Sequence, residues 1–307
     1  MSGKTGIAWT DASWNPIVGC TRVSKGCNHC YAFQLHDQRH IAWKRGRWDS
    51  APAQYHQPFS RVQLLEDRLA DPLHWRKPRR VFVNSMSDLF HPDVPGSYIT
   101  RVWVTMRNAK QHTYQILTKR PERLLEWTQA QARMSGWPIN DIWPDWIWLG
   151  VSVEDQAAAD ERIPLLLQTP AAVRFISTEP LLGPVNLRPW LFDWTTVNKW
   201  SDGTDAPRLD WVIIGGESGP HARPIVPQPV DMSDYLHTQL CIHALRDVKR
   251  QCEDAGVPVF MKQFGAVLAK RLGYRDRHGA NTAEWSHTLM ATLYKREWPT
   301  TAEEARV

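Results

Sequence analysis

Three cysteines, Cys20, Cys27 and Cys30, lie within one short stretch and are separated by six and two residues. Three thiolates can each bind one iron of a [4Fe-4S] cluster and leave the fourth iron open to a small molecule. Cys27 and Cys30 supply two ligands from one turn, and the preceding loop must bring Cys20 back to them. This spacing indicates a loop that binds a metal or a cluster.

Other interpretations of these thiols stay open. A structural zinc site would use the three cysteines with His29 or a distant ligand, although adjacent His29 and Cys30 are poorly placed to share one tetrahedral ion. Unligated thiols are a third possibility. A disulfide is disfavoured, because the chain shows no secretory signal and one bridge would leave a thiol over. Cys241 and Cys252 lie far away in a predicted helix.

Composition limits the class of protein. The chain has 307 residues, of which 42% are hydrophobic and 22% charged, enough for one large α/β domain with a substantial core. We find no apolar run long enough to span a bilayer, and we expect a cytoplasmic, reducing compartment. The net charge of +5 is compatible with a polyanionic partner without requiring one.

Seventeen tryptophans are unusual for this length, and several lie beside basic residues in 43–48 and 74–80. Basic residues interleaved with aromatic ones can bind phosphates and stack on bases. Tryptophan is also the usual anchor where helices pack on a sheet, and we favour that second interpretation.

The hydrophobic pattern predicts alternating short strands and helices, which favours a parallel sheet flanked by helices. A first strand is expected around 14–18, and the other strands at 80–84, 113–117, 147–151, 173–176, 211–214 and 257–261. Helices are expected at 32–40, 98–108, 122–134, 155–168 and 235–255, with a short one at 64–69. Residues 41–78 are predicted to be an insertion and 189–206 a loop.

Charged side chains recur just after the predicted strands. They are Asp88, Lys119, Glu154, Glu179, Glu217 and Lys262. Ligands bind at the carboxyl ends of parallel strands, so we expect these groups to converge on one mouth with the cysteine loop. The alternative is that some are helix caps, for which Ser87 or Asp88, and Asp155, are well suited.

Several sequence blocks resemble those of a known family, the phage and prophage radical SAM-like proteins of the gp-thirty-seven/gp-sixty-eight type. More distantly, the cysteine loop resembles those of spore photoproduct lyase and DNA repair photolyase radical SAM proteins. The blocks that carry the resemblance are 9–16, the cysteine loop, 83–91, 117–121, 150–155, 179–183, 215–219 and 262–265. The six-residue first gap departs from the three-residue gap of the common radical SAM motif and matches the phage family. Residues after 265 depart from the pattern.

The resemblance implies a partial (β/α)6 TIM-like barrel over residues 1–265, with 266–307 as a C-terminal extension that either packs on the barrel or is mobile. It implies a [4Fe-4S] cluster on Cys20, Cys27 and Cys30, with S-adenosyl-L-methionine on the open iron. It also implies an electron donor of the flavodoxin or ferredoxin type.

Site roles follow from position in such a barrel. Asp88, with Ser87, would bind the methionine amino group, and Lys119 the methionine carboxylate. Glu154 and Glu179 would hold ribose hydroxyls or a substrate amine. The remaining candidates are Tyr31 near the adenine, Ser152 with the cofactor, Gly215, Gly216 and Glu217 near the adenosine or the substrate, and Lys262 with Gln263 toward substrate. Lys119, Glu179 and Lys262 are the candidate catalytic residues.

The resemblance and the basic charge favour a nucleic-acid base as substrate, and one specific hypothesis is an isomerase acting on an amino-acid-modified thymine in phage DNA. A radical SAM lyase that repairs a DNA lesion is a second hypothesis. The third, from another class, is a zinc-stabilised phage protein that binds nucleic acid without catalysis.

Overall fold

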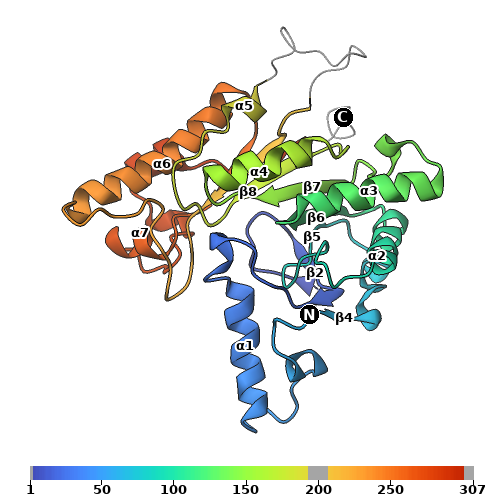
Figure 1. Cartoon of the computed structure of the whole chain (residues 1–307). Helices are drawn as coiled ribbons and strands as arrows, with labels where there is room; N and C mark the ends of the chain where they lie inside the picture. The colour runs from blue at the N-terminus through green and yellow to red at the C-terminus, as the bar shows by residue number, and fades with distance from the viewer. Residues whose placement is uncertain (1–2, 193–206, 301–307) are drawn as a thin grey trace. The chain divides into compact units, whose positions relative to one another are not determined.

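The computed structural model describes residues 3–192 and 207–300, and the chain divides into two compact units, Met1–Leu149 and Gly150–Val307. Figure 1 shows the alternation of strands and helices along the chain. Parallel pairing of successive strands confirms the predicted α/β class. None of the helices in these two described stretches is long and apolar enough to cross a membrane.

The first unit contains the strand order β1-β2-β5-β6. β1 (Gly3–Lys4) pairs antiparallel with β2 (Ala12–Trp14), which runs parallel to β5 (Arg80–Val83). β5 in turn runs parallel to β6 (Thr113–Thr118). The branched and aromatic side chains of β5 and β6 are mostly buried, which is typical of strands covered on both faces.

Three helices connect and flank these strands: α1 (Tyr31–Lys44), α2 (Gly96–Asn108) and α3 (Pro121–Ser135). α3 begins with proline at its first position, where no backbone donor is needed, and is followed by Gly136 with φ +72°. Short 3-10 turns lie at Lys25–Cys27, Ala53–His56, Glu66–Arg68, Asp71–His74 and Ile139–Asp141.

Two predictions near the cysteine loop are wrong in detail. The strand expected at 14–18 is two strands: β2 ends at Trp14, and β3 (Ile17–Val18) pairs antiparallel with β4 (Gln63–Leu64) in a separate two-stranded sheet. The helix expected at 64–69 is therefore β4 followed by one 3-10 turn. Pro16 separates β2 from β3, which the sequence pattern did not resolve.

The second unit contains parallel strands β8 (Arg174–Thr178), β9 (Trp211–Gly215) and β10 (Val259–Gln263), in that order. β7 (Ile147–Ser152) crosses the boundary between the units and is buried throughout. The helices are α4 (Gln156–Leu167), α5 (Arg188–Leu191), α6 (Asp234–Asp254), α7 (Ala266–Arg271) and α8 (His287–Leu293), with a 3-10 turn at Thr282–Glu284. Most of the loop predicted at 189–206 lies outside the described residues, and its beginning is α5.

The described part of the C-terminal segment packs on this second unit. Arg296 forms a β-bridge with Phe260, the Trp211 indole N–H donates to the Glu297 carbonyl at 2.8 Å, and the Trp285 ring stacks on Phe264. Of the two alternatives from sequence, the packed one holds for these residues.

The preferred interpretation, that the tryptophans beside basic residues fill a core, holds only in part, whereas eight tryptophans elsewhere in the described chain are buried. Trp9, Trp14, Trp103, Trp127, Trp143, Trp148, Trp211 and Trp285 are buried. Trp43, Trp48 and Trp75, which lie among the basic residues, are only half-buried.

Candidate functional site

The cysteine loop lies between β3 and α1. Cys27 ends a 3-10 turn and is buried, and Cys30 is the residue before α1. Cys20 and Cys30 are half-buried and pack against an apolar cluster that includes Phe33 and Phe59. All three predicted ligands therefore come from one loop that is held against the first unit's core.

The loop is joined to the end of β5 by hydrogen bonds. The Gly19 N–H donates to the Met86 carbonyl at 3.1 Å, and the Ser87 hydroxyl donates to the Ile17 carbonyl at 2.9 Å. The Asn15 carboxamide oxygen accepts the Met86 N–H at 2.8 Å. Gly19 has φ +104°, and a Cβ there would overlap the backbone of residues 59–61. Ser87, predicted to bind cofactor, thus positions this loop.

Asp88 is buried and fully hydrogen-bonded. One carboxylate oxygen accepts the Phe90 N–H at 3.0 Å and the Thr118 hydroxyl at 2.8 Å. The other accepts the Lys119 backbone N–H at 3.2 Å and the Arg120 guanidinium at 2.8 Å. Asp88 therefore does not cap α2, whose N-cap is Pro95; it ties the end of β5 to the end of β6.

Arg120 connects this carboxylate to the cysteine loop. Its guanidinium lies 3.7 Å from Cys20 Sγ and donates to the Thr21 carbonyl at 3.0 Å. The Thr21 hydroxyl lies 2.7 Å from His91 Nε2. The side chain that pairs with Asp88 is therefore that of Arg120. The neighbouring Lys119, which the sequence predicted for this site, contacts Asp88 through its backbone N–H.

Burial raises the pKa of the Cys20 thiol to about 11, with the Asp88 charge acting in the same direction and Arg120 opposing it. Burial also lowers the pKa of His91, and Arg120 adds to that effect. A thiol must lose its proton to bind a metal, and Arg120 is the group present that stabilises the thiolate of Cys20.

The residues of this loop fit a cluster in kind and number. Nowhere in 3–192 or 207–300 do three or more His, Cys, Asp or Glu side chains form a group that could hold a metal ion. A single tetrahedral ion requires ligands that converge on one point, whereas a [4Fe-4S] cluster takes one thiolate on each of three irons. The three thiols supply the number and kind of ligands in the second donor set, but the described residues do not gather them into a metal-binding group, so their role as ligands stays a prediction.

Tyr31 begins α1 directly after the cysteines. Its hydroxyl donates to the Ser85 carbonyl at 2.6 Å, and half of its side chain is exposed. Tyr31, which was predicted to flank the cluster, therefore contacts the residues that follow β5.

Asn84, at the end of β5, was not predicted. It is the one residue other than glycine with positive φ in the described chain, at 62°. Its carboxamide is buried, and neither polar atom has a hydrogen-bond partner among the described residues. Backbone strain and unpaired buried polar groups are typical of functional sites, and neither has a signature in a single sequence.

In the second unit, Glu154 follows β7 and forms a buried ion pair with Arg162 of α4, at 2.9 Å. Arg162 also donates to the Ser152 carbonyl at 2.7 Å. Asp155 caps α4 by accepting the Ala158 N–H, so the capping alternative holds there. Ser152 and Glu154, predicted to bind cofactor, brace the strand against its own helix.

Glu179 follows β8 and meets Lys262 of β10, with Nζ 3.0 Å from Oε2. Its other oxygen is buried without a hydrogen-bond partner among the described atoms. This carboxylate lies against Gly215, where a Cβ would overlap it. Two of the predicted catalytic residues are thus brought together, and Gly215 is needed to make room for them.

The adjacent glycines also serve the packing of the chain. A Cβ on Gly216 would overlap the Phe264 carbonyl, and Gly265, with φ +85°, lies against the backbone of Gly216 and Glu217. The Gln263 carboxamide donates to the Gly216 carbonyl at 3.1 Å. Protein atoms alone explain why Gly215 and Gly216 lack a side chain. A close approach of adenosine to these glycines therefore stays a prediction.

Glu217 is buried and pairs with Arg223, whose Nε donates to it at 2.9 Å. Arg223 also feels the charge of Glu154, and the two together raise its pKa. The strand-end groups of the second unit therefore lie near one another. Convergence of these groups with Asp88 and the cysteine loop stays a prediction.

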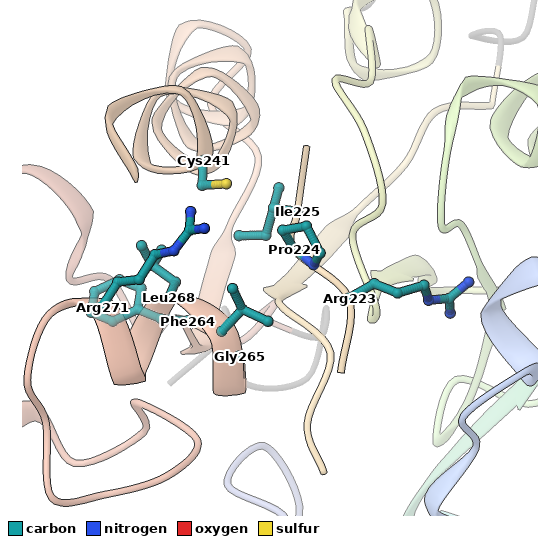
Figure 2. Close-up of a pocket in the computed structure, with 9 residues that line it drawn as sticks. Arg223, Pro224, Ile225, Cys241, Phe264, Gly265, Leu268 and Arg271 are labelled. Carbon is teal, nitrogen blue, oxygen red and sulfur yellow. The ribbon is translucent and has the colours of Figure 1, made fainter. Parts of the chain in front are cut away.

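A small pocket lies beside α6 and α7 (Figure 2). Its lining is mostly apolar, with the Cys241 thiol and the Arg271 guanidinium at one side and the Arg223 guanidinium pointing away. Arg271 is held by Asp234 at 2.9 Å and by Gln228 at 2.7 Å. None of the site residues predicted from sequence lines this pocket.

Comparison with protein families shows which family the chain belongs to. Residues 4–295 match the family model described as "Protein of unknown function (DUF5131)", and the chain belongs to this family. The match extends 30 residues beyond position 265. Neither the curated proteins nor the solved structures gave a match.

Proposed function

We propose that this protein is a radical SAM enzyme that modifies or rearranges a nucleic-acid base. The observation that carries the proposal is the cysteine loop itself. Three thiols from one loop are anchored to the end of β5, and a buried Arg120–Asp88 pair reaches the first of them. Loop, pair and strand end form one polar network within the first unit.

In this proposal, Cys20, Cys27 and Cys30 hold a [4Fe-4S] cluster. When bound there, the cluster and S-adenosyl-L-methionine would supply one-electron reduction and the radical chemistry that removes a hydrogen atom from the substrate. A flavodoxin- or ferredoxin-type protein supplies the electron. The proposal places the protein in the reducing cytoplasm and expects a partial (β/α)6 barrel.

The chain's own residues would orient the reactants. Arg120 offers an N–H to Cys20 Sγ, and hydrogen bonds to cluster sulfurs are one of the factors that set a reduction potential. Asp88 holds Arg120 in place, and the Ser87 and Asn15 contacts fix the loop. In the second unit, Glu179 and Lys262 would accept and donate hydrogen bonds to substrate.

The test is anaerobic reconstitution with iron and sulfide, followed by an absorption spectrum and an assay for 5′-deoxyadenosine with dithionite and S-adenosyl-L-methionine. We expect a brown protein that absorbs broadly near ~400 nm and releases 5′-deoxyadenosine. Modified phage DNA is then added, and its nucleosides are analysed by mass spectrometry.

Two variants make the test specific. Cys27→Ala should lose the cluster and the 5′-deoxyadenosine, whereas Cys241→Ala, a buried thiol of α6 far along the chain, should keep both. A colourless protein that holds one zinc, or cleavage that survives Cys27→Ala, would exclude the proposal.

A further inference from the structure

The net charge of the protein resides in one segment, residues 20–61. This segment contains seven of the 37 Lys and Arg residues but only two of the 32 Asp and Glu residues. The rest of the chain therefore has 30 of each sign and is neutral overall. The segment comprises the cysteine loop, α1 and the turn at Ala53–His56, and we call it the α1 arm.

Five of the seven basic residues of the α1 arm are exposed and have no acidic partner among the described residues. Arg22, Lys44, Arg45, Arg47 and Arg61 are exposed, and none of them forms an ion pair within the described part of the chain. Many arginines elsewhere are paired: Arg80 with Asp11, Arg120 with Asp88, Arg162 with Glu154, Arg188 with Asp254 and Arg223 with Glu217. Of the two acidic residues, Asp37 accepts the Phe59 N–H at 3.0 Å.

Aromatic packing fixes the α1 arm within the first unit. The Trp43 ring stacks on His56 with centroids 4.4 Å apart, and Phe33 meets Phe59 edge-on at 4.5 Å. The Arg39 guanidinium lies over the Tyr55 ring. The aromatic residues of this region therefore hold α1 against the following turn, and the exposed charges are carried by an ordered element.

Three of these charges lie at the end of α1, in the sequence Lys44-Arg45-Gly46-Arg47. Gly46 has φ +65°, the left-handed conformation that turns the chain after a helix. The turn places three cations within four residues. Unneutralised Lys and Arg clustered on one element are the electrostatic footprint of a nucleic-acid-binding surface.

We infer that the α1 arm binds the phosphate backbone of a nucleic acid, with Lys44, Arg45 and Arg47 as its main contacts. This inference rests on the proposed function for the substrate class and goes beyond it by naming the surface. The α1 arm also contains Cys20, Cys27 and Cys30, so a strand bound along it lies beside the cysteine loop.

The pattern of α1 favours nucleic acid over a lipid surface. A helix that lies on a membrane separates an apolar face from a basic face. α1 shows almost no such separation: Leu35 and Ile41 are exposed, whereas Phe33 and His36 are buried. Contacts to phosphates need exposed cations, and they do not need a continuous apolar face.

The test is fluorescence-anisotropy titration of the full-length protein with a labelled DNA single strand and with the corresponding duplex, at several salt concentrations. We expect binding that weakens steeply with salt. The triple variant Lys44→Gln, Arg45→Gln, Arg47→Gln should bind about tenfold more weakly or worse. It should also lower the slope of log affinity against log salt by about two to three, because each neutralised phosphate accounts for ~0.7–0.9 of that slope.

The matched control is Lys110→Gln, Lys270→Gln, Arg277→Gln, which removes three exposed cations outside the α1 arm and gives the same net charge. It should bind DNA like the wild type. Equal weakening in both triple variants, no salt-dependent binding by the wild type, or binding only to anionic phospholipid vesicles overturns the inference.

Failure of this inference and failure of the proposed function are distinguishable. DNA binding is measured without cofactor, and 5′-deoxyadenosine formation is measured without DNA. If both triple variants release 5′-deoxyadenosine like the wild type but bind DNA alike, only the binding surface is wrong.

Discussion

Asp88 in the first unit and Glu154 in the second are alike in kind, since each is a buried carboxylate after a parallel strand and pairs with a buried arginine. The origin of the arginine differs. Arg162 lies eight residues after Glu154, on the helix of the same strand–helix unit. Arg120 comes from the end of the next strand, and it also reaches Cys20 and Thr21. The Glu154 pair braces one strand–helix unit, whereas the Asp88 pair joins two strand ends to the cysteine loop.

The same difference extends to the other strand-end groups. Glu217 pairs with Arg223, six residues later in the same loop. The exception in the second unit is Glu179, whose partner Lys262 is two strands away. Long-range pairing of polar groups is harder to explain by local bracing, and it therefore singles out the Asp88 network and the Glu179–Lys262 pair as candidates for function.

The largest expected effects come from removing either buried carboxylate. Glu154→Ala leaves the Arg162 charge buried without its partner, and Asp88→Ala does the same to Arg120. Each should lower the free energy of unfolding by ~3–5 kcal/mol, measured by urea denaturation. Asp88→Ala alone should also speed labelling of Cys20 by a thiol reagent, because it frees the loop and removes a nearby negative charge.

Peptide mapping by mass spectrometry locates the labelled cysteine. Equal rates of Cys20 labelling in the two variants would mean that the Asp88 pair is a brace like the Glu154 pair. Asp88→Asn, which keeps the shape and several hydrogen bonds, should lie between Asp88→Ala and the wild type.

A smaller effect is expected from Gly215→Ala. The new Cβ overlaps the Glu179 carboxylate and must displace it from Lys262. Overpacking of this kind costs about 1–3 kcal/mol. Gly183→Ala is the control, because no atom lies near its Cβ position. Similar stability of both variants, measured by thermal denaturation, would show that Glu179 moves freely and that its pairing with Lys262 is not a fixed feature.

The two units should also differ in their response to acid. Burial lowers the pKa of His36 and of His112 in the first unit. Each ring has one nitrogen against a backbone carbonyl and the other buried without a partner, which requires the neutral form. The unfolded state therefore binds more protons, and stability should be complete above pH ~6.5 and fall as the pH drops below it.

Hydrogen exchange at about pH 7.5 and about pH 5.5, on either side of the ordinary histidine pKa and corrected for the intrinsic rates, checks this prediction. Protection should decrease more in α1 and β6 than in β9 and β10. Uniform loss across the chain would point instead to acidic groups shared by both units.

The smallest expected effect is that of Asn84→Gly. Glycine adopts positive φ without a steric penalty and removes two unpaired buried polar atoms. We expect the variant to be more stable by about 1 kcal/mol, measured by urea denaturation, because removal of the unpaired polar atoms outweighs the greater freedom of glycine in the unfolded chain. If the variant also loses 5′-deoxyadenosine formation, the strained conformation of Asn84 is needed for the activity of the site. Lower stability would show that the carboxamide has a structural role.

The sequence was sufficient for the alternation of strands and helices. Short apolar runs at 80–84, 113–117 and 147–151 became β5, β6 and β7, because buried strands and helices leave strong local patterns. It failed where segments are shorter than the pattern can resolve. β2, β3 and β4 have two or three residues each, and their pairing is set by partners distant in the chain.

In the candidate site, too, some residues could be predicted from the sequence and others only from the folded chain. Spacing alone selected Cys20, Cys27 and Cys30, and position after a strand selected Asp88, Glu179 and Lys262. Arg120 was passed over for Lys119, since adjacent residues at a strand end point in different directions and only the folded chain shows which one turns inward.

What the sequence determined by itself was the α/β class, the cysteine spacing and the concentration of positive charge in residues 20–61, because each is a property of residue types and their order. Tertiary structure decided which charges are paired, that the glycines at 215 and 216 make room for protein atoms, and that Asn84 is strained. Those features depend on contacts between residues tens of positions apart, which no local pattern records.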